Sequence, residues 1–285
     1  MQRTDFRCFH RLRVRWAEVD MQKIVFNAHY LMYIDTAMMD YWRALALPYE
    51  ASMAVLGGDI YVKKATLEYH ASAQLEDLLD IGLRCARVGN SSLLLQAGIF
   101  RGEQLLVSGE LVYVFADPAT QTSRPVPEAL RAIFAAYEAG DAMAHAHCGA
   151  WDALGPDAAR VRHAVFIQEQ GIPADIEVDE LDATAVHVVL RNRLGMPVAT
   201  GRLLQHAPGE GRIGRMAVER ALRGGGWGRQ VLRALEDAAR ARGDQRVLLH
   251  AQVQARAFYE RAGYHIHGEP WMEAGIPHIT MQRAL

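Results

Sequence analysis

The sequence predicts an α+β protein of two domains: an antiparallel sheet wrapped around a long helix, and then a unit in which strands alternate with helices. The length of 285 residues favours two domains of ordinary size. One long helical pattern followed by several strand patterns marks the first half. A glycine-rich turn between a strand and a helix marks the second half.

The composition excludes several classes of protein. A net charge of −2 does not show the basic excess that is typical of nucleic-acid-binding proteins. A content of 51% hydrophobic residues excludes wholesale disorder. Cys8, Cys85 and Cys148 lie far apart, which argues against a disulfide scaffold or a zinc cage and favours a reducing compartment. No apolar run approaches 18 residues and the N-terminus has no apolar core. We therefore expect a cytoplasmic protein with no membrane span and no signal peptide.

The elements of the first half follow from hydrophobic spacing. Alternating side chains predict a strand at 9–16 with Trp16 on its buried face. Apolar residues at helical spacing predict a buried helix over about residues 28–45, ended by Pro48. The later elements are expected strands at 58–70, 78–88, 91–101 and 104–115 and a short helix at 127–138.

The segment VRWAEVDMQKIVFNAHYLMYID leads from the first strand into the long helix. It resembles the corresponding motif of hotdog-fold thioesterases, in the 4-hydroxybenzoyl-CoA thioesterase-like (YbgC-like) branch. The resemblance covers about residues 8–138. It implies a hotdog fold, hydrolysis of acyl-CoA thioesters, and a homodimer or tetramer formed through this domain.

Asp20 and Asn27 are the candidate catalytic residues of this half. The first amides of a helix are free donors that can hold a developing oxyanion. The resemblance implies that Asp20 acts as nucleophile or general base beside that helix start. The alternative is that Asp20 only caps a turn or the helix. Lys23 stands where the family usually has glycine, and Asn27, which cannot act as a base, where many relatives have His or Tyr.

A stretch rich in alanine and glycine separates the halves. We expect a hotdog domain at 1–140, a linker at 141–156 and a second domain at 157–285. His145, His147 and Cys148 fall in this linker. A metal site there is conceivable, but a flexible connector is favoured, and no metal is expected.

The elements of the second half are read in the same way. They are a helix at 157–168, two strands within 184–205, a strand at 212–219, a helix after Trp227, a strand at 246–251, a short helix at 255–264 and a final strand at 278–285.

The turn RGGGWG at residues 223–228 carries the chemistry of this half. Glycines let backbone amides approach an anion, and the helix start adds a favourable dipole, so the turn suits a pyrophosphate. A plain helix-entry loop is the alternative. The turn has neither the lysine of a P-loop nor the spacing of a dinucleotide fingerprint.

The pattern Arg-x-x-Gly-x-Gly resembles the acetyl-CoA motif of the GNAT acetyltransferases. The flanking segments VFIQEQGIP, IGRMAV, FYERAGY and GIPHITM resemble its ElaA-like branch, over about residues 151–285. The resemblance implies an α/β fold with a mixed sheet, and acetyl-CoA as co-substrate. The implied CoA-binding residues are Met216, Ala217, Val218, Arg223, Gly224, Gly225, Gly226, Trp227, Gly228 and Arg229.

Tyr259 is implied as the general acid that protonates the leaving CoA thiolate. A phenol with a pKa near 10 suits a thiolate of similar basicity. A packed aromatic residue is the alternative. No base for the amine is obvious: the candidates are Glu169, His187, Glu180 and His278, each more often structural, and Gln252 or Gln254 could contact CoA or the substrate.

Both halves thus point to acyl-CoA chemistry. We expect a bifunctional enzyme that hydrolyses acyl-CoA thioesters and transfers an acetyl group from acetyl-CoA to an unidentified amine. An acyl-carrier-protein thioester is a further possibility for the first half. The alternative function is an acyl-CoA-binding or regulatory protein in which one domain is inactive.

Overall fold

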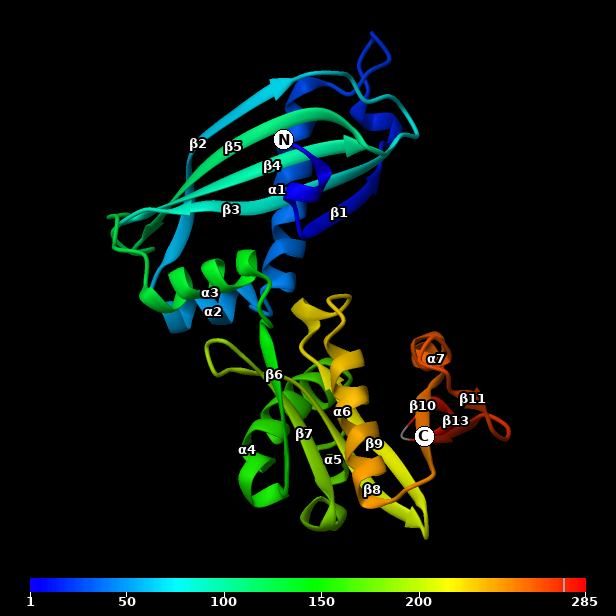
Figure 1. The fold of residues 1–285 in the computed structure, drawn as a ribbon. Helices are drawn as coiled ribbons and strands as arrows, with labels where there is room; N and C mark the ends of the chain where they lie inside the picture. Colours follow the sequence, from blue (N-terminus) through cyan, green and yellow to red (C-terminus); the bar gives the residue numbers. More distant parts are fainter. Residues whose placement is uncertain (274) are drawn as a thin grey trace. The chain divides into compact units, whose positions relative to one another are not determined.

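The computed structural model describes residues 1–273 and 275–285, which divide into two compact units, Met1–Met143 and Ala144–Leu285 (Figure 1). Each unit has its own sheet: the first is antiparallel and the second is mixed, as the fold-class prediction required. Among the described residues, no helix combines the length and apolarity needed to cross a membrane.

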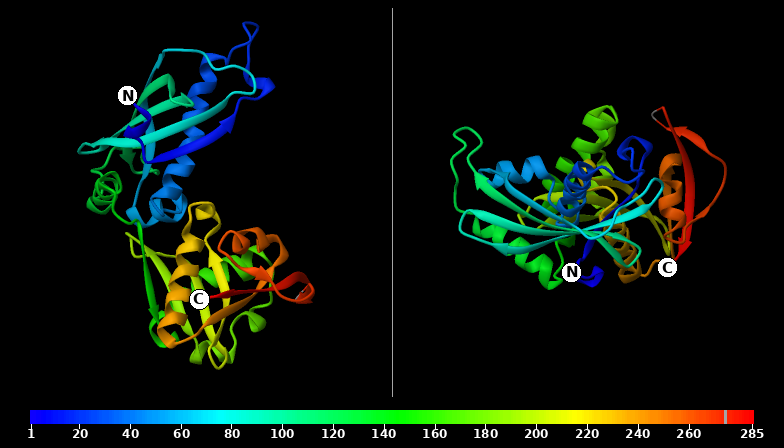
Figure 2. Two further views of the ribbon diagram at one scale, coloured as in Figure 1. Left: turned by 45° about the vertical axis from the view of Figure 1, so that its right-hand side comes forward. Right: turned by 90° about the horizontal axis from the view of Figure 1, so that it is seen from above.

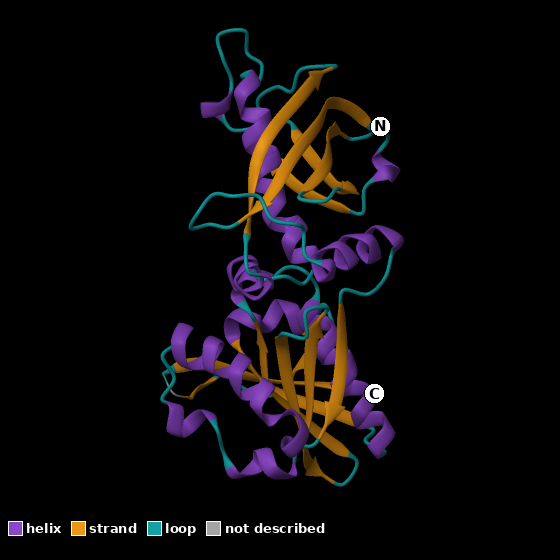
Figure 3. Cartoon of the chain, turned by 90° about the vertical axis from the view of Figure 1, so that its left-hand side faces the viewer, coloured by secondary structure: helices purple, strands orange, loops and turns teal. Residues whose placement is uncertain are grey.

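The N-terminal unit is a five-stranded sheet in the order β1-β3-β4-β5-β2. Its strands are β1 (Cys8–Arg13), β2 (Asp59–Tyr69), β3 (Leu78–Val88), β4 (Ser92–Arg101) and β5 (Gln104–Ala116). Its helices are α1 (Asn27–Ala44), α2 (Tyr49–Leu56) and α3 (Glu128–Ala139). The strands curve around α1, which packs against β1 and β3 (Figures 2 and 3).

Helix α1 forms because its apolar side chains repeat at helical spacing over 18 residues that contain neither proline nor glycine. Its buried side chains are Tyr30, Tyr33, Ile34, Ala37, Met38, Tyr41 and Trp42. The buried hydroxyl of Tyr41 donates a hydrogen bond to Glu138 of α3 at 2.7 Å, so this polar group is satisfied inside the core.

The structure of this unit differs from the prediction in two places. The first strand ends at Arg13, because the chain turns into a short 3-10 helix at Trp16–Glu18, and Trp16 is 79% exposed instead of buried. Helix α2 was not predicted. Its boundaries are nevertheless in the sequence, since Pro48 precedes its first turn and Gly57 ends it in the left-handed conformation, at φ +71°.

The C-terminal unit is an eight-stranded sheet in the order β11-β13-β10-β9-β8-β7-β6, with β12 paired to β13. Its strands are β6 (Ala144–Gly149), β7 (Val186–Asn192), β8 (Pro197–Ala207), β9 (Glu210–Val218), β10 (Arg246–Gln252), β11 (His265–Ile266), β12 (Trp271–Glu273) and β13 (Ile276–Ala284). Its helices are α4 (Trp151–Arg162), continued by a π-helical segment (His163–Glu169), α5 (Ala174–Glu177), α6 (Trp227–Arg242) and α7 (Arg256–Glu260).

Helices α4 and α6 cover opposite faces of this sheet. Val189 of β7 packs against Leu154 and Ala158 of α4. A Cβ at Gly201, which pairs with Val188, would point at Val231 of α6. Because successive strand residues point to opposite faces, the two helices lie on the two sides of the sheet.

The linker expected at 141–156 is not a flexible connector. Ala144–Gly149 form β6, which pairs with β7 at the edge of the sheet, and α4 begins at Trp151. Residues rich in alanine and histidine gave no strand alternation in the sequence because every side chain from His145 to Cys148 is exposed. His147 and Cys148 are neighbours on one strand and point to opposite faces, so the three candidate ligands do not converge.

Candidate active sites

A pocket of about 510 Å³ opens at the start of α1 in the N-terminal unit. Asp20 and Asn27 both line it, together with Tyr30, Tyr69 and Ser72. The sequence therefore identified two residues that the fold brings to one pocket. Tyr69 and Ser72 come from β2 and the loop after it, and no sequence signal linked them to Asp20.

The loop between Asp20 and the helix is a tight, hydrogen-bonded turn. The Asp20 amide donates to the Ile24 carbonyl, the Lys23 amide donates to the Asp20 carbonyl, and the Gln22 amide donates to Asp20 Oδ1 at 2.8 Å. One carboxylate oxygen of Asp20 thus fixes the turn. The second carboxylate oxygen has no hydrogen-bond partner among the described residues, so Asp20 can serve both the turn and a ligand.

Lys23 has a φ of +64°, the left-handed region that favours glycine. This explains physically why glycine suits this position in the resembling family. We expect Lys23→Gly to raise the free energy of unfolding by about 0.5–1 kcal/mol, because relief of the strain exceeds the added flexibility of glycine. Chemical denaturation measures this. Lys23→Ala keeps the strain, so an equal gain in that variant would contradict the explanation.

Helix α1 begins without a side-chain cap. Phe26 is the N-cap residue, and the His29 amide donates to its carbonyl. The amides of Asn27 and Ala28 have no acceptor among the described residues, and both residues are exposed. Two free donors therefore stand at the positive end of an 18-residue helix, and Asn27, the first residue of this helix, lines the pocket that Asp20 also lines.

Glu18 is a second carboxylate near this loop, but its hydrogen bonds are already used. It is 3% exposed, accepts a hydrogen bond from the Tyr33 hydroxyl at 2.7 Å, and pairs with Arg15. Burial alone would raise its pKa, but the bonds from Arg15 and Tyr33 outweigh burial and leave the pKa below its usual value. Glu18 therefore holds the loop and stays ionised.

A cavity of about 540 Å³ lies in the C-terminal unit where two parallel strands separate. β9 and β10 pair only as far as Ile213 and Leu249. β9 then bulges against β8 around Arg215, whose φ is +50°. Beyond this point, no backbone pairing joins β9 to β10 among the described residues, so the β9 edge from Met216 to Val218 faces the cavity.

The glycine turn stands at one end of this cavity. Gly224 and Gly226 both have φ of +87°, and Gly226 is the N-cap residue of α6. Among the described residues, the amides of Gly224, Gly226 and Gly228 have no acceptor. The turn therefore offers three unoccupied donors at the N-terminus of a 16-residue helix, which suits an anion.

The predicted CoA-binding residues have different positions around this turn. Those that line the cavity are Met216, Ala217, Val218, Arg223 and Gly228. The side chain of Trp227 is buried against the core, and Arg229 lies in a separate pocket with Arg233 and Arg261. Gly224, Gly225 and Gly226 are exposed on the turn.

The side chain of Arg223 stabilises the glycine turn through hydrogen bonds and does not project freely into solvent. Its guanidinium donates to both carboxylate oxygens of Glu169, at 2.6 and 2.7 Å, and to the carbonyl of Val218 at 3.1 Å. The bond from Arg223 is the main cause that lowers the pKa of Glu169. Glu169 is therefore a poor candidate for the base.

Tyr259 of α7 lines the same cavity and is 9% exposed. Its hydroxyl points to the sulfur of Met216 at 3.7 Å, and burial raises its pKa to about 12. The phenol is therefore protonated at neutral pH, and it lies beside the unpaired β9 edge.

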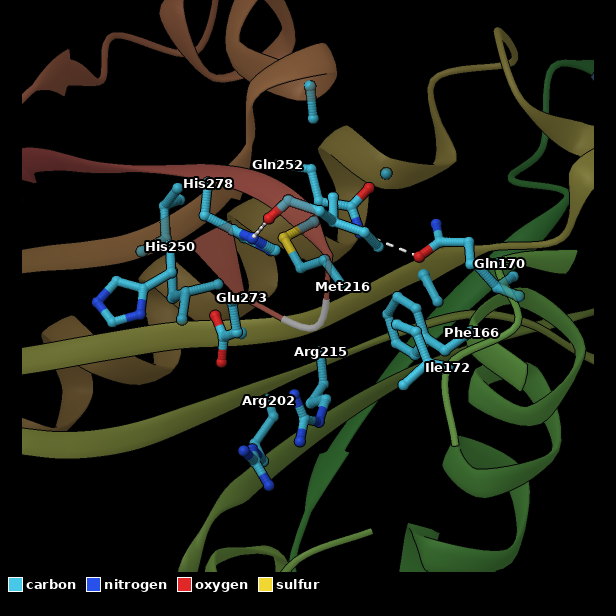
Figure 4. A pocket seen from close by; sticks show the side chains of 18 of the residues that line it. Phe166, Gln170, Ile172, Arg202, Arg215, Met216, His250, Gln252, Glu273 and His278 are labelled. Carbon is cyan, nitrogen blue, oxygen red and sulfur yellow. Dashed lines mark hydrogen bonds between the residues drawn. The ribbon is translucent and has the colours of Figure 1, made fainter. Parts of the chain in front are cut away.

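His278 is the base candidate that lines the cavity. Its Nδ1 lies 2.9 Å from the carbonyl of Ile276, which fixes Nδ1 as the donor and leaves Nε2 able to accept a proton (Figure 4). His187 is fully buried against the Asp182 carbonyl, and Glu180 is exposed outside the cavity. Neither can reach the cavity.

Gln252 and Gln254 both line the cavity and belong to one chain of amides. Gln254 donates to Gln252 at 2.8 Å. Gln252 donates to Gln170 at 2.9 Å (Figure 4). Gln170 follows the π-helical segment, so this chain ties the helical wall of the cavity to β10.

Sequence reasoning missed several charged or titratable residues of the cavity, among them Arg202, Arg212, His250 and Glu273. They come from β8, β9, β10 and β12, which are far apart in the chain. Each resembles an ordinary strand residue in sequence. Only the strand order brings them together.

A buried network of three arginines and three carboxylates forms part of the cavity wall. Arg162, which is 1% exposed, donates to Glu177 at 2.5 Å and to both oxygens of Asp182 at 2.8 and 3.0 Å. Arg202 donates to both oxygens of Asp179 and to Asp182. Arg215 donates to Asp179 at 3.1 Å. The network ties α4 to α5, the following loop, β8 and β9.

Comparisons with known proteins divide the chain in the same way. The family described as "Acetyltransferase (GNAT) domain" matches residues 156–285, and "Thioesterase-like superfamily" matches residues 14–134. The chain is 38% identical over 128 residues to the "Uncharacterized N-acetyltransferase YjcF" of Bacillus subtilis (strain 168), covering 45% of this chain and 90% of that protein.

The other half matches a different relative. It is 28% identical over 124 residues to the "Acyl-CoA thioester hydrolase YbgC" of Escherichia coli O157:H7, covering 43% of this chain and 92% of that protein. Among solved structures, an acyl-CoA N-acyltransferase from Pseudomonas aeruginosa is 35% identical, with a TM-score of 0.45, covering 50% of this chain and 99% of that chain.

Proposed function

The chain belongs to the GNAT acetyltransferase family through residues 156–285 and carries a thioesterase-like hotdog domain at residues 14–134, and on this premise we propose that it is a bifunctional acyl-CoA enzyme. Its N-terminal domain hydrolyses acyl-CoA thioesters, and its C-terminal domain transfers an acetyl group from acetyl-CoA to an amine. The observation that carries the proposal is that each unit has a pocket with unpaired helix N-terminal amides nearby and a side chain suited to thioester chemistry.

In the hydrolase, the amides of Asn27 and Ala28 stabilise the oxyanion that forms when the thioester carbonyl is attacked. Asp20 takes the proton of the attacking water, or attacks the carbonyl itself, and the C–S bond then breaks to release CoA. Asn27 contributes hydrogen bonds and no base catalysis. The free carboxylate oxygen of Asp20, in a pocket that Asn27 also lines, supports this assignment.

We also propose that this domain forms a homodimer or tetramer, and that the protein works in the cytoplasm. Trp16, Met21 and Phe26 support the assembly, because these large apolar side chains are 79%, 101% and 48% exposed, and Met21 and Phe26 line the pocket. A monomer exposes few such side chains together. A partner copy that covers them would also close the pocket around the acyl group.

In the transferase, the unpaired edge from Met216 to Val218 holds the pantetheine arm, and the glycine-turn amides hold the pyrophosphate. The amine nitrogen attacks the acetyl carbon and the C–S bond breaks. Tyr259 gives its proton to the leaving thiolate, and His278 takes the proton from the amine. The products are the acetylated amine and CoA.

The transferase assignment is tested by Tyr259→Phe. Losing the acid should lower the kcat of acetyl transfer by about 10²-fold or more, with little change in acetyl-CoA affinity. Because the pKa of Tyr259 is raised to about 12, the wild-type rate should show no fall from ionisation of this phenol below about pH 11. Steady-state kinetics across pH measure both effects.

Tyr264→Phe is the matched control, since that hydroxyl donates to Glu236 and does not line the cavity. Its kcat should stay near wild type. A Tyr259→Phe variant with unchanged kcat would contradict the acid role.

The two activities are separated by measuring thiol release from acyl-CoAs with and without added amines. Release without amine reports hydrolysis, and acetylated amine detected by mass spectrometry reports transfer. Binding of acyl-CoA without turnover in one domain would instead favour the alternative, a protein in which that domain is regulatory.

A further inference from the structure

The end of the C-terminal cavity away from the glycine turn carries charges that the proposed acetyl transfer does not use. Arg202 and Arg215 lie together there, and Glu273 lies between them and His250 (Figure 4). Arg212 of β9 lines the same cavity and interacts electrostatically with His250. These residues face the acceptor side, because the CoA-binding turn occupies the other end.

Two of these arginines are already neutralised. Arg202 donates to Asp179 and Asp182, and Arg215 donates to Asp179, within the buried network described above. With Arg162 and Glu177 the network holds three cations and three anions, so it adds no net charge to the cavity. The network forms part of the cavity wall, and recognition of a charged acceptor is left to Arg212 and Glu273.

Arg212 and Glu273 are not neutralised. Within residues 1–273 and 275–285, neither side chain makes a hydrogen bond or an ion pair. Burial lowers the pKa of His250 most, Arg212 lowers it further, and Glu273 raises it. His250 is therefore neutral near pH 7, and the acceptor end presents one free cation and one free anion from two strands.

We propose that the acceptor is an amino-acid-like molecule, with a primary amine and a carboxylate a few atoms apart. Arg212 binds its carboxylate and Glu273 attracts its ammonium group before His278 takes the proton. The amine nitrogen then forms a bond to the acetyl carbon, the C–S bond breaks, and Tyr259 protonates the thiolate. The products are an N-acetyl amino acid and CoA. This inference rests on the proposed acetyl transfer.

The test compares the α-amino acids with their α-amides as acceptors, with the full chain, acetyl-CoA and mass-spectrometric detection of the acetylated product. The amide keeps the amine and loses the negative charge. We expect kcat/KM to be about tenfold or more higher for the preferred acid than for its amide, as a charge-assisted pair requires.

Two variants assign the effect to residues. Arg212→Gln should lower kcat/KM about tenfold for the acid and less than about twofold for the amide. Glu273→Gln should lower kcat/KM for the amino acid and for its amide, because both acceptors carry the amine. Arg193→Gln, in the turn between β7 and β8, is the control and should change neither.

The outcomes separate this inference from the proposed function. Equal kcat/KM for acid and amide, or a preference for amines without a carboxylate, overturns the inference and leaves acetyl transfer standing. The inference is also overturned if Arg212→Gln lowers kcat/KM for the amino acid and for its amide by the same factor. No acetylated product from any amino acid, amide or simple amine contradicts acetyl transfer itself.

Discussion

Asp20→Asn is expected to lower the rate of acyl-CoA hydrolysis by about 10²–10⁴-fold, the usual contribution of a positioned general base. Asparagine keeps the oxygen that accepts from the Gln22 amide, so the turn is retained while the basic carboxylate is lost. The measurement is thiol release from a panel of acyl-CoAs without added amine. This substitution separates catalysis from the alternative in which Asp20 only caps a turn.

Asp117→Asn is the matched control. Asp117 accepts from the Ala119 amide at 2.8 Å, two residues later in the chain, as Asp20 does from Gln22, but it lies outside the pocket at the start of α1. Its variant should hydrolyse acyl-CoA at the wild-type rate. Unchanged hydrolysis in Asp20→Asn would remove the basis for the hydrolase assignment.

Arg162→Met is expected to destabilise the C-terminal unit by about 3–5 kcal/mol, because it leaves Glu177 and Asp182 buried with fewer partners. The measurement is chemical denaturation with hydrogen exchange followed in residues 144–285. Arg191→Met is the control, since the Arg191–Asp157 pair is about one-third exposed and should cost about 1 kcal/mol or less. Equal losses of stability in the two variants would show that the buried network stabilises the unit no more than an exposed ion pair does.

The same network predicts a pH dependence. Burial would raise the pKa of Asp182, but the bonds from Arg162 and Arg202 outweigh it and hold the pKa below its usual value. A depressed carboxylate pKa adds stability above the unfolded pKa of about 3.9, and this stability is lost as pH falls through the folded pKa. The difference in the free energy of unfolding between wild type and Arg162→Met should therefore become smaller below about pH 4.

Local patterns gave most of the fold. The helix at 28–45 and the strands at 78–88 and 104–115 were found within a residue or two, because apolar side chains recur in them at the period of a helix or of a strand. Strand β6 was missed for the opposite reason. It is an edge strand with exposed side chains, so its partner β7 and not its own pattern makes it a strand.

The candidate sites follow the same division. Asp20, Asn27 and the glycine turn could be found because each depends on a few consecutive residues beside a helix start. The sequence by itself, through its resemblance to two families, therefore indicated a thioesterase-like domain and a GNAT domain and the local loops of their candidate sites. Only the tertiary structure decided that Arg223 binds Glu169, that Arg212 and Glu273 line one cavity, and that Arg162 is neutralised inside the core. Those pairings depend on strand order and burial, which join residues far apart in the chain.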